Sequence, residues 1–120
     1  MKDLAPHVFR QRLLVEGLYT IELTREKLAS YLLGVAAHLD LKAYGEPVIY
    51  SPAGLGKSEN QGFDAFLPLV DSGISAYVWS AARFFSIVLY NFWHLHYTLV
   101  SQFLLLCAKF LEWFLNGFLE

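Results

Sequence analysis

Three apolar runs follow one another in the second half of the chain, at residues 63–70, 74–79 and 84–90. The spacers between them, residues 71–73 and 80–82, are short and consist of small or polar residues. Spacers of this kind join antiparallel strands. The pattern therefore predicts a three-stranded antiparallel meander, which limits the possible folds more than any other feature of the sequence.

The third run is apolar on both of its faces. Alternate residues of a strand point to opposite faces, and the two sets are Phe84, Ser86, Val88 and Tyr90 on one face and Phe85, Ile87 and Leu89 on the other. An antiparallel strand with one face in water alternates apolar with polar residues. Hydrophobic residues make up 56% of the chain and aromatic residues 17%, which is a surplus for one small core. We therefore expect helices over one face and the sheet of a second copy over the other, in a homodimer formed by sheet–sheet packing.

The remaining elements place helices beside this meander. Thr24 is a suitable N-cap for a helix whose apolar residues recur at helical spacing, namely Leu28, Leu32, Val35, Ala36 and Leu39. The pattern also predicts strands at residues 12–19 and 47–51, a polar glycine-rich connection at 52–62 and an amphipathic helix at 97–119. This order predicts one α+β domain over residues 1–120. It would be a two-layer α/β sandwich, an antiparallel sheet with two helices on one face.

Charge and cysteine content narrow the range of partners. The formal net charge of -2 provides no basic footprint for nucleic acid. Residues 1–12 lack the apolar stretch of a secretory signal, and the single cysteine, Cys107, has no partner for an internal disulfide. The alternative that residues 99–119 span a membrane is disfavoured by Lys109 and Glu112, which lie in the middle of the segment. We expect a cytoplasmic protein that binds a small-molecule substrate, with neither a membrane nor a nucleic acid as partner.

Three polar features are candidate sites. Residues 54–58 (GLGKS) look like the end of a phosphate-binding loop, but the glycine that the motif needs is replaced by Ser51. His94 and His96 have no Cys, Asp or Glu near them in the sequence, so no metal site is expected. Glu16 interrupts an apolar strand, and it is either solvated or a carboxylate that binds a cationic substrate.

Residues 61–92 carry a series of features in a fixed order. The pair Gln61-Gly62 precedes an apolar strand, which leads into the pair Asp71-Ser72. A second strand then ends at Trp79 and a third at Tyr90. In this order and spacing the chain resembles the small bacterial-type S-adenosylmethionine decarboxylases, which are pyruvoyl-dependent enzymes of polyamine biosynthesis.

The resemblance implies that the chain cuts its own backbone between Asp71 and Ser72. In that family the serine hydroxyl attacks the preceding carbonyl, and the ester that forms is converted to a pyruvoyl group. The resemblance thus implies a pyruvoyl cofactor derived from Ser72, with Asp71 on the other side of the cut. It also suggests Tyr77 as a proton handler and Glu16, in a strand that looks like the family's first strand, as the substrate-binding carboxylate.

Four positions differ from the family pattern, and one of them is Asn91, which stands where the family has a threonine. Gly73 and Tyr77 stand where the family has histidines, and Phe92 stands where it has the cysteine that protonates the product. Two hypotheses therefore stay open. The first is a decarboxylase acting on S-adenosylmethionine after self-cleavage, and the second is a non-catalytic relative that is not processed and binds a ligand or regulates a partner.

Overall fold

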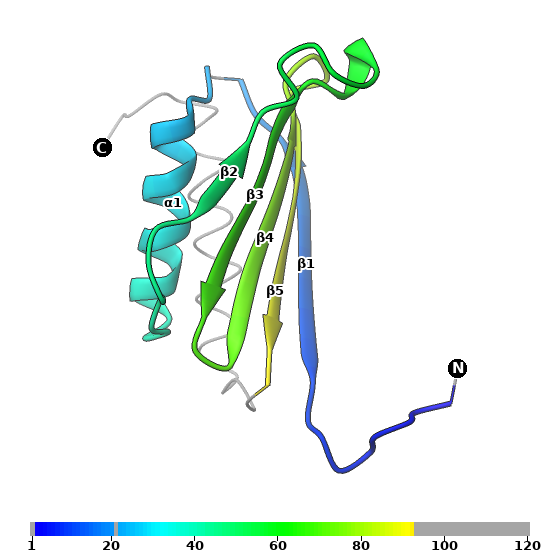
Figure 1. Cartoon of the computed structure of the whole chain (residues 1–120), viewed down its shortest axis with the longest axis vertical. Helices are drawn as coiled ribbons and strands as arrows, with labels where there is room; N and C mark the ends of the chain where they lie inside the picture. The colour runs from blue at the N-terminus through cyan, green and yellow to red at the C-terminus, as the bar shows by residue number, and fades with distance from the viewer. Residues whose placement is uncertain (1, 21, 93–120) are drawn as a thin grey trace.

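The computed structural model describes residues 2–20 and 22–92, which form one antiparallel sheet and one α-helix (Figure 1). The sheet has five strands in the order β1-β5-β4-β3-β2, and all neighbouring strands are antiparallel. The elements in chain order are β1 (Gln11–Leu18), α1 (Arg25–His38), β2 (Val48–Tyr50), a short 3-10 helix (Ser58–Asn60), β3 (Gly62–Leu69), β4 (Ser72–Trp79) and β5 (Phe84–Asn91). The meander of β3, β4 and β5 is thus flanked by β1 on one side and by β2 on the other.

The helix α1 begins where the sequence predicts it. The Thr24 hydroxyl accepts a hydrogen bond from the backbone N–H of Lys27 at 3.2 Å and caps the first turn. The buried residues of α1 share one face, and they are Leu28, Leu32, Val35 and Ala36. The guanidinium of Arg25 donates to the Ile49 carbonyl, which ties the start of α1 to β2.

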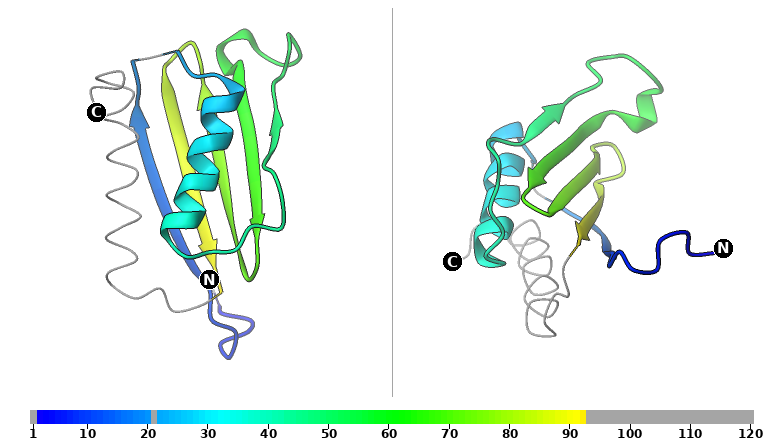
Figure 2. Two further views of the ribbon diagram at one scale, coloured as in Figure 1. Left: turned by 90° about the vertical axis from the view of Figure 1, so that its left-hand side faces the viewer. Right: turned by 60° about the horizontal axis from the view of Figure 1, so that its bottom comes forward.

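One face of the sheet packs against the helix, whereas the other is exposed. The helix α1 lies across one face (Figure 2), and the side chains beneath it form the core, among them Leu67, Ile74, Phe85 and Leu89 with no exposed surface. No described element covers the opposite face, which we call the open face. Several large apolar side chains are exposed on it, including Leu14 (60%), Leu18 (62%), Phe66 (47%) and Tyr77 (42%).

The predicted α+β class is confirmed, with an antiparallel sheet and a helix on one face. The second predicted helix, at residues 97–119, lies outside the described residues, as does the segment 99–119 with its alternative interpretation as a membrane span. Within the described part of the chain, no helix combines the length and the apolar character needed to cross a membrane.

The β3–β4 connection is tighter than the sequence predicts. We expected a three-residue spacer after Val70, but β3 ends at Leu69 and β4 begins at Ser72, so the turn consists of Val70 and Asp71. The prediction was wrong because strand pairing depends on the backbone. Ser72 and Gly73 join the ladder through their backbone groups although their side chains look like those of a turn.

Gly62 lies where the start of β3 approaches β4 too closely for a side chain. A Cβ atom at this position would lie 1.8 Å from the Val78 carbonyl oxygen. We predict that Gly62→Ala lowers the free energy of unfolding by about 2–3 kcal/mol, because the backbone must move to admit the methyl group. Gly45→Ala is the matched control, since a Cβ there meets nothing within 4 Å. Urea unfolding compares the two variants, and equal midpoints would contradict the pairing of β3 with β4.

Candidate functional site

The bond between Asp71 and Ser72 lies at the exit of the β3–β4 turn. Leu69 and Ser72 pair across this turn, and Asp71 has a φ of 57°, in the left-handed region. For a residue with a Cβ atom this region costs about 1–2 kcal/mol. Asp40, Ala53 and Arg83 share this conformation, so it is not specific to the β3–β4 turn. The bond that the resemblance identifies as the cut follows one such residue.

Hydrogen bonds from two other segments hold this turn. The backbone N–H of Val70 donates to the Lys42 carbonyl at 2.9 Å, and the backbone N–H of Phe92 donates to the Asp71 carbonyl oxygen at 3.1 Å. The second bond places a fixed donor on the carbonyl that Ser72 would attack. Donors at roughly 2.7–3.1 Å stabilise the negative charge that develops on such an oxygen. The Phe92 N–H is therefore a candidate oxyanion donor.

Ser72 lies at the end of the sheet in a row of polar residues. Its hydroxyl donates to the Val70 carbonyl at 3.3 Å, which holds the oxygen toward the turn. The register places Asn91 of β5 beside Ser72, and Gln11 of β1 beside Asn91. Asn91 has no exposed surface. Gln11 Oε1 is buried and has no hydrogen-bond partner among the described residues.

Sequence reasoning did not identify the two amides in this row. Asn91 carries one visible signal, because it is the polar residue that follows the apolar run 84–90. Its alignment with Ser72 and Gln11 depends on the pairing of three strands. That pairing is not visible in the sequence.

Tyr77 and Glu16 lie on the open face, away from Ser72. Tyr77 is five residues further along β4 than Ser72, which corresponds to about 17 Å of extended strand. Both Tyr77 and Glu16 pair with Ser86 of β5, so these three residues form one row. Asp71 and Ser72 thus lie together at the turn, and Tyr77 and Glu16 lie together in a row on the open face. Within one chain the structure does not bring these two pairs into contact.

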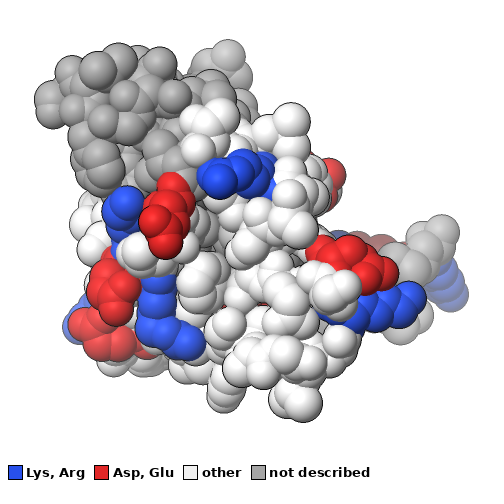
Figure 3. Space-filling model, turned by 90° about the horizontal axis from the view of Figure 1, so that it is seen from above, with Lys and Arg blue, Asp and Glu red and all other residues white. Residues whose placement is uncertain are grey.

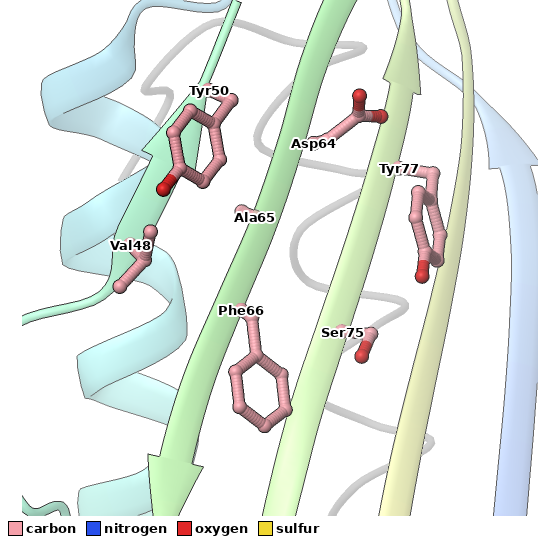
Figure 4. A pocket seen from close by; sticks show the side chains of 7 residues that line it. All are labelled: Val48, Tyr50, Asp64, Ala65, Phe66, Ser75 and Tyr77. Carbon is pink, nitrogen blue, oxygen red and sulfur yellow. The ribbon is translucent and has the colours of Figure 1, made fainter.

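The row on the open face continues to Asp64 of β3 and Tyr50 of β2. A hollow of about 280 Å³ lies here, lined by Val48, Tyr50, Asp64, Ala65, Phe66, Ser75 and Tyr77. Figure 4 shows the rings of Tyr50 and Tyr77 on either side of β3, with Asp64 toward one end of the hollow and Phe66 toward the other. Sequence reasoning missed Asp64, although a charged residue inside the apolar run 63–70 is a visible signal.

Two of the positions that differ from the family pattern have a packing role. A Cβ at Gly73 would lie 3.1 Å from the Phe66 ring, so the glycine leaves room for that ring. The Phe92 ring packs edge-on against Tyr90, with ring centroids 5.1 Å apart. Arg12 also lies over the Tyr90 ring, 5.1 Å from its centroid. The Phe92 side chain thus belongs to a surface cluster with Tyr90 and Arg12. The Phe92 backbone bonds to the β3–β4 turn.

Charged side chains of both signs lie close together on the molecule. Figure 3 shows one end of it, where basic and acidic side chains are neighbours and neither sign forms a continuous patch on that face. Among residues 2–20 and 22–92, no three His, Cys, Asp or Glu side chains are grouped as a metal site would need. His94 and His96 lie outside those residues.

Comparison with protein-family models, with curated proteins and with solved structures finds no match to this chain. Function is therefore inferred from the geometry of the turn and of the open face, together with the resemblance carried by residues 61–92.

Proposed function

We propose that this chain cleaves its own backbone between Asp71 and Ser72 and acts as a pyruvoyl-dependent decarboxylase on S-adenosylmethionine, in polyamine biosynthesis. The observation that carries the proposal is the hydrogen bond from the Phe92 N–H to the Asp71 carbonyl. The Phe92 N–H thus points at the carbonyl oxygen of Asp71. Asp71 directly precedes Ser72, and its φ lies in the left-handed region. The resemblance of residues 61–92 to the decarboxylases suggests the reaction class.

The cut needs a nucleophile, a stabilised oxyanion and a route for protons. Ser72 Oγ attacks the Asp71 carbonyl carbon, and the Phe92 N–H stabilises the charge that develops on the carbonyl oxygen. The C–N bond between the two residues then breaks. The Ser72 nitrogen takes up the serine proton and becomes a free amine, while the serine oxygen stays bound to Asp71 as an ester.

Two further steps generate the ketone. Loss of the Cα proton of Ser72 expels the Asp71 carboxylate and leaves an unsaturated residue. Water then replaces the amine nitrogen, which departs as ammonia. The resulting carbonyl withdraws electrons from an amine-bearing substrate as the carboxylate of that substrate leaves.

Two side-chain amides near Ser72 are able to hydrogen-bond to a ketone formed from that residue. The amides of Asn91 and Gln11 lie in the same row as Ser72. An amide N–H donates to a carbonyl oxygen, and an amide oxygen accepts from an amine. These two side chains are therefore candidates to orient the ketone or the substrate amine. The resemblance suggests Glu16 for substrate binding and Tyr77 for proton transfer, but both lie away from Ser72 of the same chain.

One observation favours a second function. Glu16 and Tyr77 lie on the open face, and a ligand bound to them does not reach Ser72 of the same chain. A chain that is never cut would keep this row as a binding surface. The second candidate is therefore a non-catalytic relative that binds a ligand or regulates a partner.

We also propose that two copies pair through their open faces, in the cytoplasm. The exposed apolar residues of that face outside the hollow include Leu14 and Leu18 of β1. Covering these leucines with the sheet of a second copy would remove them from water.

Intact-mass spectrometry of the purified full chain tests the cut. We expect two fragments, residues 1–71 and residues 72–120, the second with a blocked ketone start. Ser72→Ala lacks the hydroxyl and should remain one chain, whereas Ser75→Ala, a change on the same strand, should be cut like the native protein. A native protein that stays at a single uncut mass after long incubation would rule out pyruvoyl catalysis and leave the binding function.

The oxyanion donor can be removed without changing the nucleophile. Phe92→Pro has no backbone N–H, so we predict cleavage about a hundredfold slower. Phe92→Ala keeps the N–H and should be cut at close to the native rate. A mass-spectrometric time course on freshly made protein compares the variants, and equal rates for the proline and alanine variants would show that this hydrogen bond plays no part in the cut.

Light scattering at micromolar concentration tests the pairing of copies. We expect a dimer for the native chain and a monomer for Leu14→Glu. An unpaired charge buried at an interface costs roughly 3 kcal/mol or more, a weakening of at least about a hundredfold. Leu55→Glu changes an exposed leucine of the β2–β3 loop and should leave the dimer intact. A native monomer under these conditions would contradict the proposed interface.

A further inference from the structure

Asp64 lies between two tyrosines on the open face. The register pairs Asp64 directly with Tyr50 on one side and with Tyr77 on the other. Directly opposed Cβ atoms in a sheet lie about 5 Å apart. Phe66 follows on the same face, with its ring toward the far end of the hollow (Figure 4). One carboxylate is thus accompanied by three aromatic rings.

No described residue neutralises this carboxylate. Asp64 forms no ion pair or hydrogen bond with any residue in the described part of the chain. Among the strand residues, the register places one basic side chain on this face, that of Arg12, and it lies over the Tyr90 ring. By strand spacing Arg12 is roughly 20 Å from Asp64. Glu16, in the same row as Asp64, adds a second negative charge to the face.

We propose that the hollow binds a small organic cation whose charge is spread over alkyl groups, such as an alkylated ammonium. The faces of aromatic rings attract cations through the ring quadrupole. Asp64 supplies the opposite charge at close range. The rings of Tyr50 and Tyr77 have free surface to offer a ligand, since 68% and 42% of these residues are exposed. The volume of about 280 Å³ admits a head group of this kind with a short alkyl chain.

The lining residues disfavour other classes of ligand. Asp64, the Ser75 hydroxyl and the phenol oxygens of the two tyrosines provide too few oxygens for a calcium ion, which takes about six to eight. An anion would be repelled by the carboxylate. A neutral apolar molecule would bury Asp64 without a partner, which is costly.

This site does not depend on the cut at Ser72. All its lining residues come from β2, β3 and β4, and the hollow lies on the face opposite the core. An uncut chain would therefore bind the cation as well as a processed one. Cation binding and self-cleavage are therefore tested separately, and either proposal can be wrong while the other is right.

Ligand-detected NMR on the full chain tests the site, with choline as the probe. The control ligand is the uncharged isostere that has a tert-butyl group in place of the trimethylammonium. Because each exposed aromatic contact is weak, we expect choline to bind with a Kd of about a millimolar and the isostere to bind at least about tenfold more weakly. Equal binding of the two ligands would overturn the proposal.

Variants identify the groups that hold the cation. Asp64→Asn and Tyr50→Leu should each weaken choline binding at least about fivefold, whereas Tyr50→Phe keeps the ring and should bind like the native chain. Glu22→Gln removes the same charge from an exposed residue that precedes α1, outside the row on the open face, and should change the Kd less than about twofold. Circular dichroism verifies that each variant is folded. Unchanged binding in a folded Asp64→Asn variant, or equal losses in it and in Glu22→Gln, would overturn the proposal.

Discussion

The pairing of β5 with both β1 and β4 is the constraint on which the rest of the structure depends. Side chains alternate along a strand, so a slip of one residue would exchange the two faces of the sheet. In the observed register Phe85, Ile87 and Leu89 are buried in the core, while Phe84 and Val88 belong to the open face. The core, the turn beside Ser72 and the row across the open face all follow from this one alignment.

The same alignment sets the geometry at the proposed cut. Because β5 remains paired as far as Asn91, the next residue, Phe92, directs its N–H to the Asp71 carbonyl. Asn91 itself lies beside Ser72. The backbone of β5 thus supplies a donor to the carbonyl, and its last side chain supplies an amide to the same end of the sheet. Neither contribution depends on the identity of the Phe92 side chain, which packs on Tyr90.

The two faces of the sheet separate two kinds of chemistry. Beside the partly buried Ser72, the side chains of Asn91 and Gln11 are fully and partly buried, whereas Asp71 is exposed. On the open face, carboxylates and aromatic rings are in contact with water and can take up a ligand or a second copy of the chain. We therefore propose self-cleavage at the turn and ligand binding at the row that contains Glu16, Tyr77 and Asp64.

The α+β class, the meander and the helix capped by Thr24 could be predicted from the sequence by itself, because alternation, helical spacing and capping are local properties of the chain. The sequence also identified Ser72 and Glu16 as candidates, the first by motif order and the second as a charge in an apolar strand. Only the tertiary structure decided that Ser72 begins a strand, that Asn91 lies beside it and that Asp64 lies between two tyrosines. The physical reason is that strand register arises from backbone hydrogen bonds between residues far apart in the chain, and these bonds leave no periodic trace in the sequence.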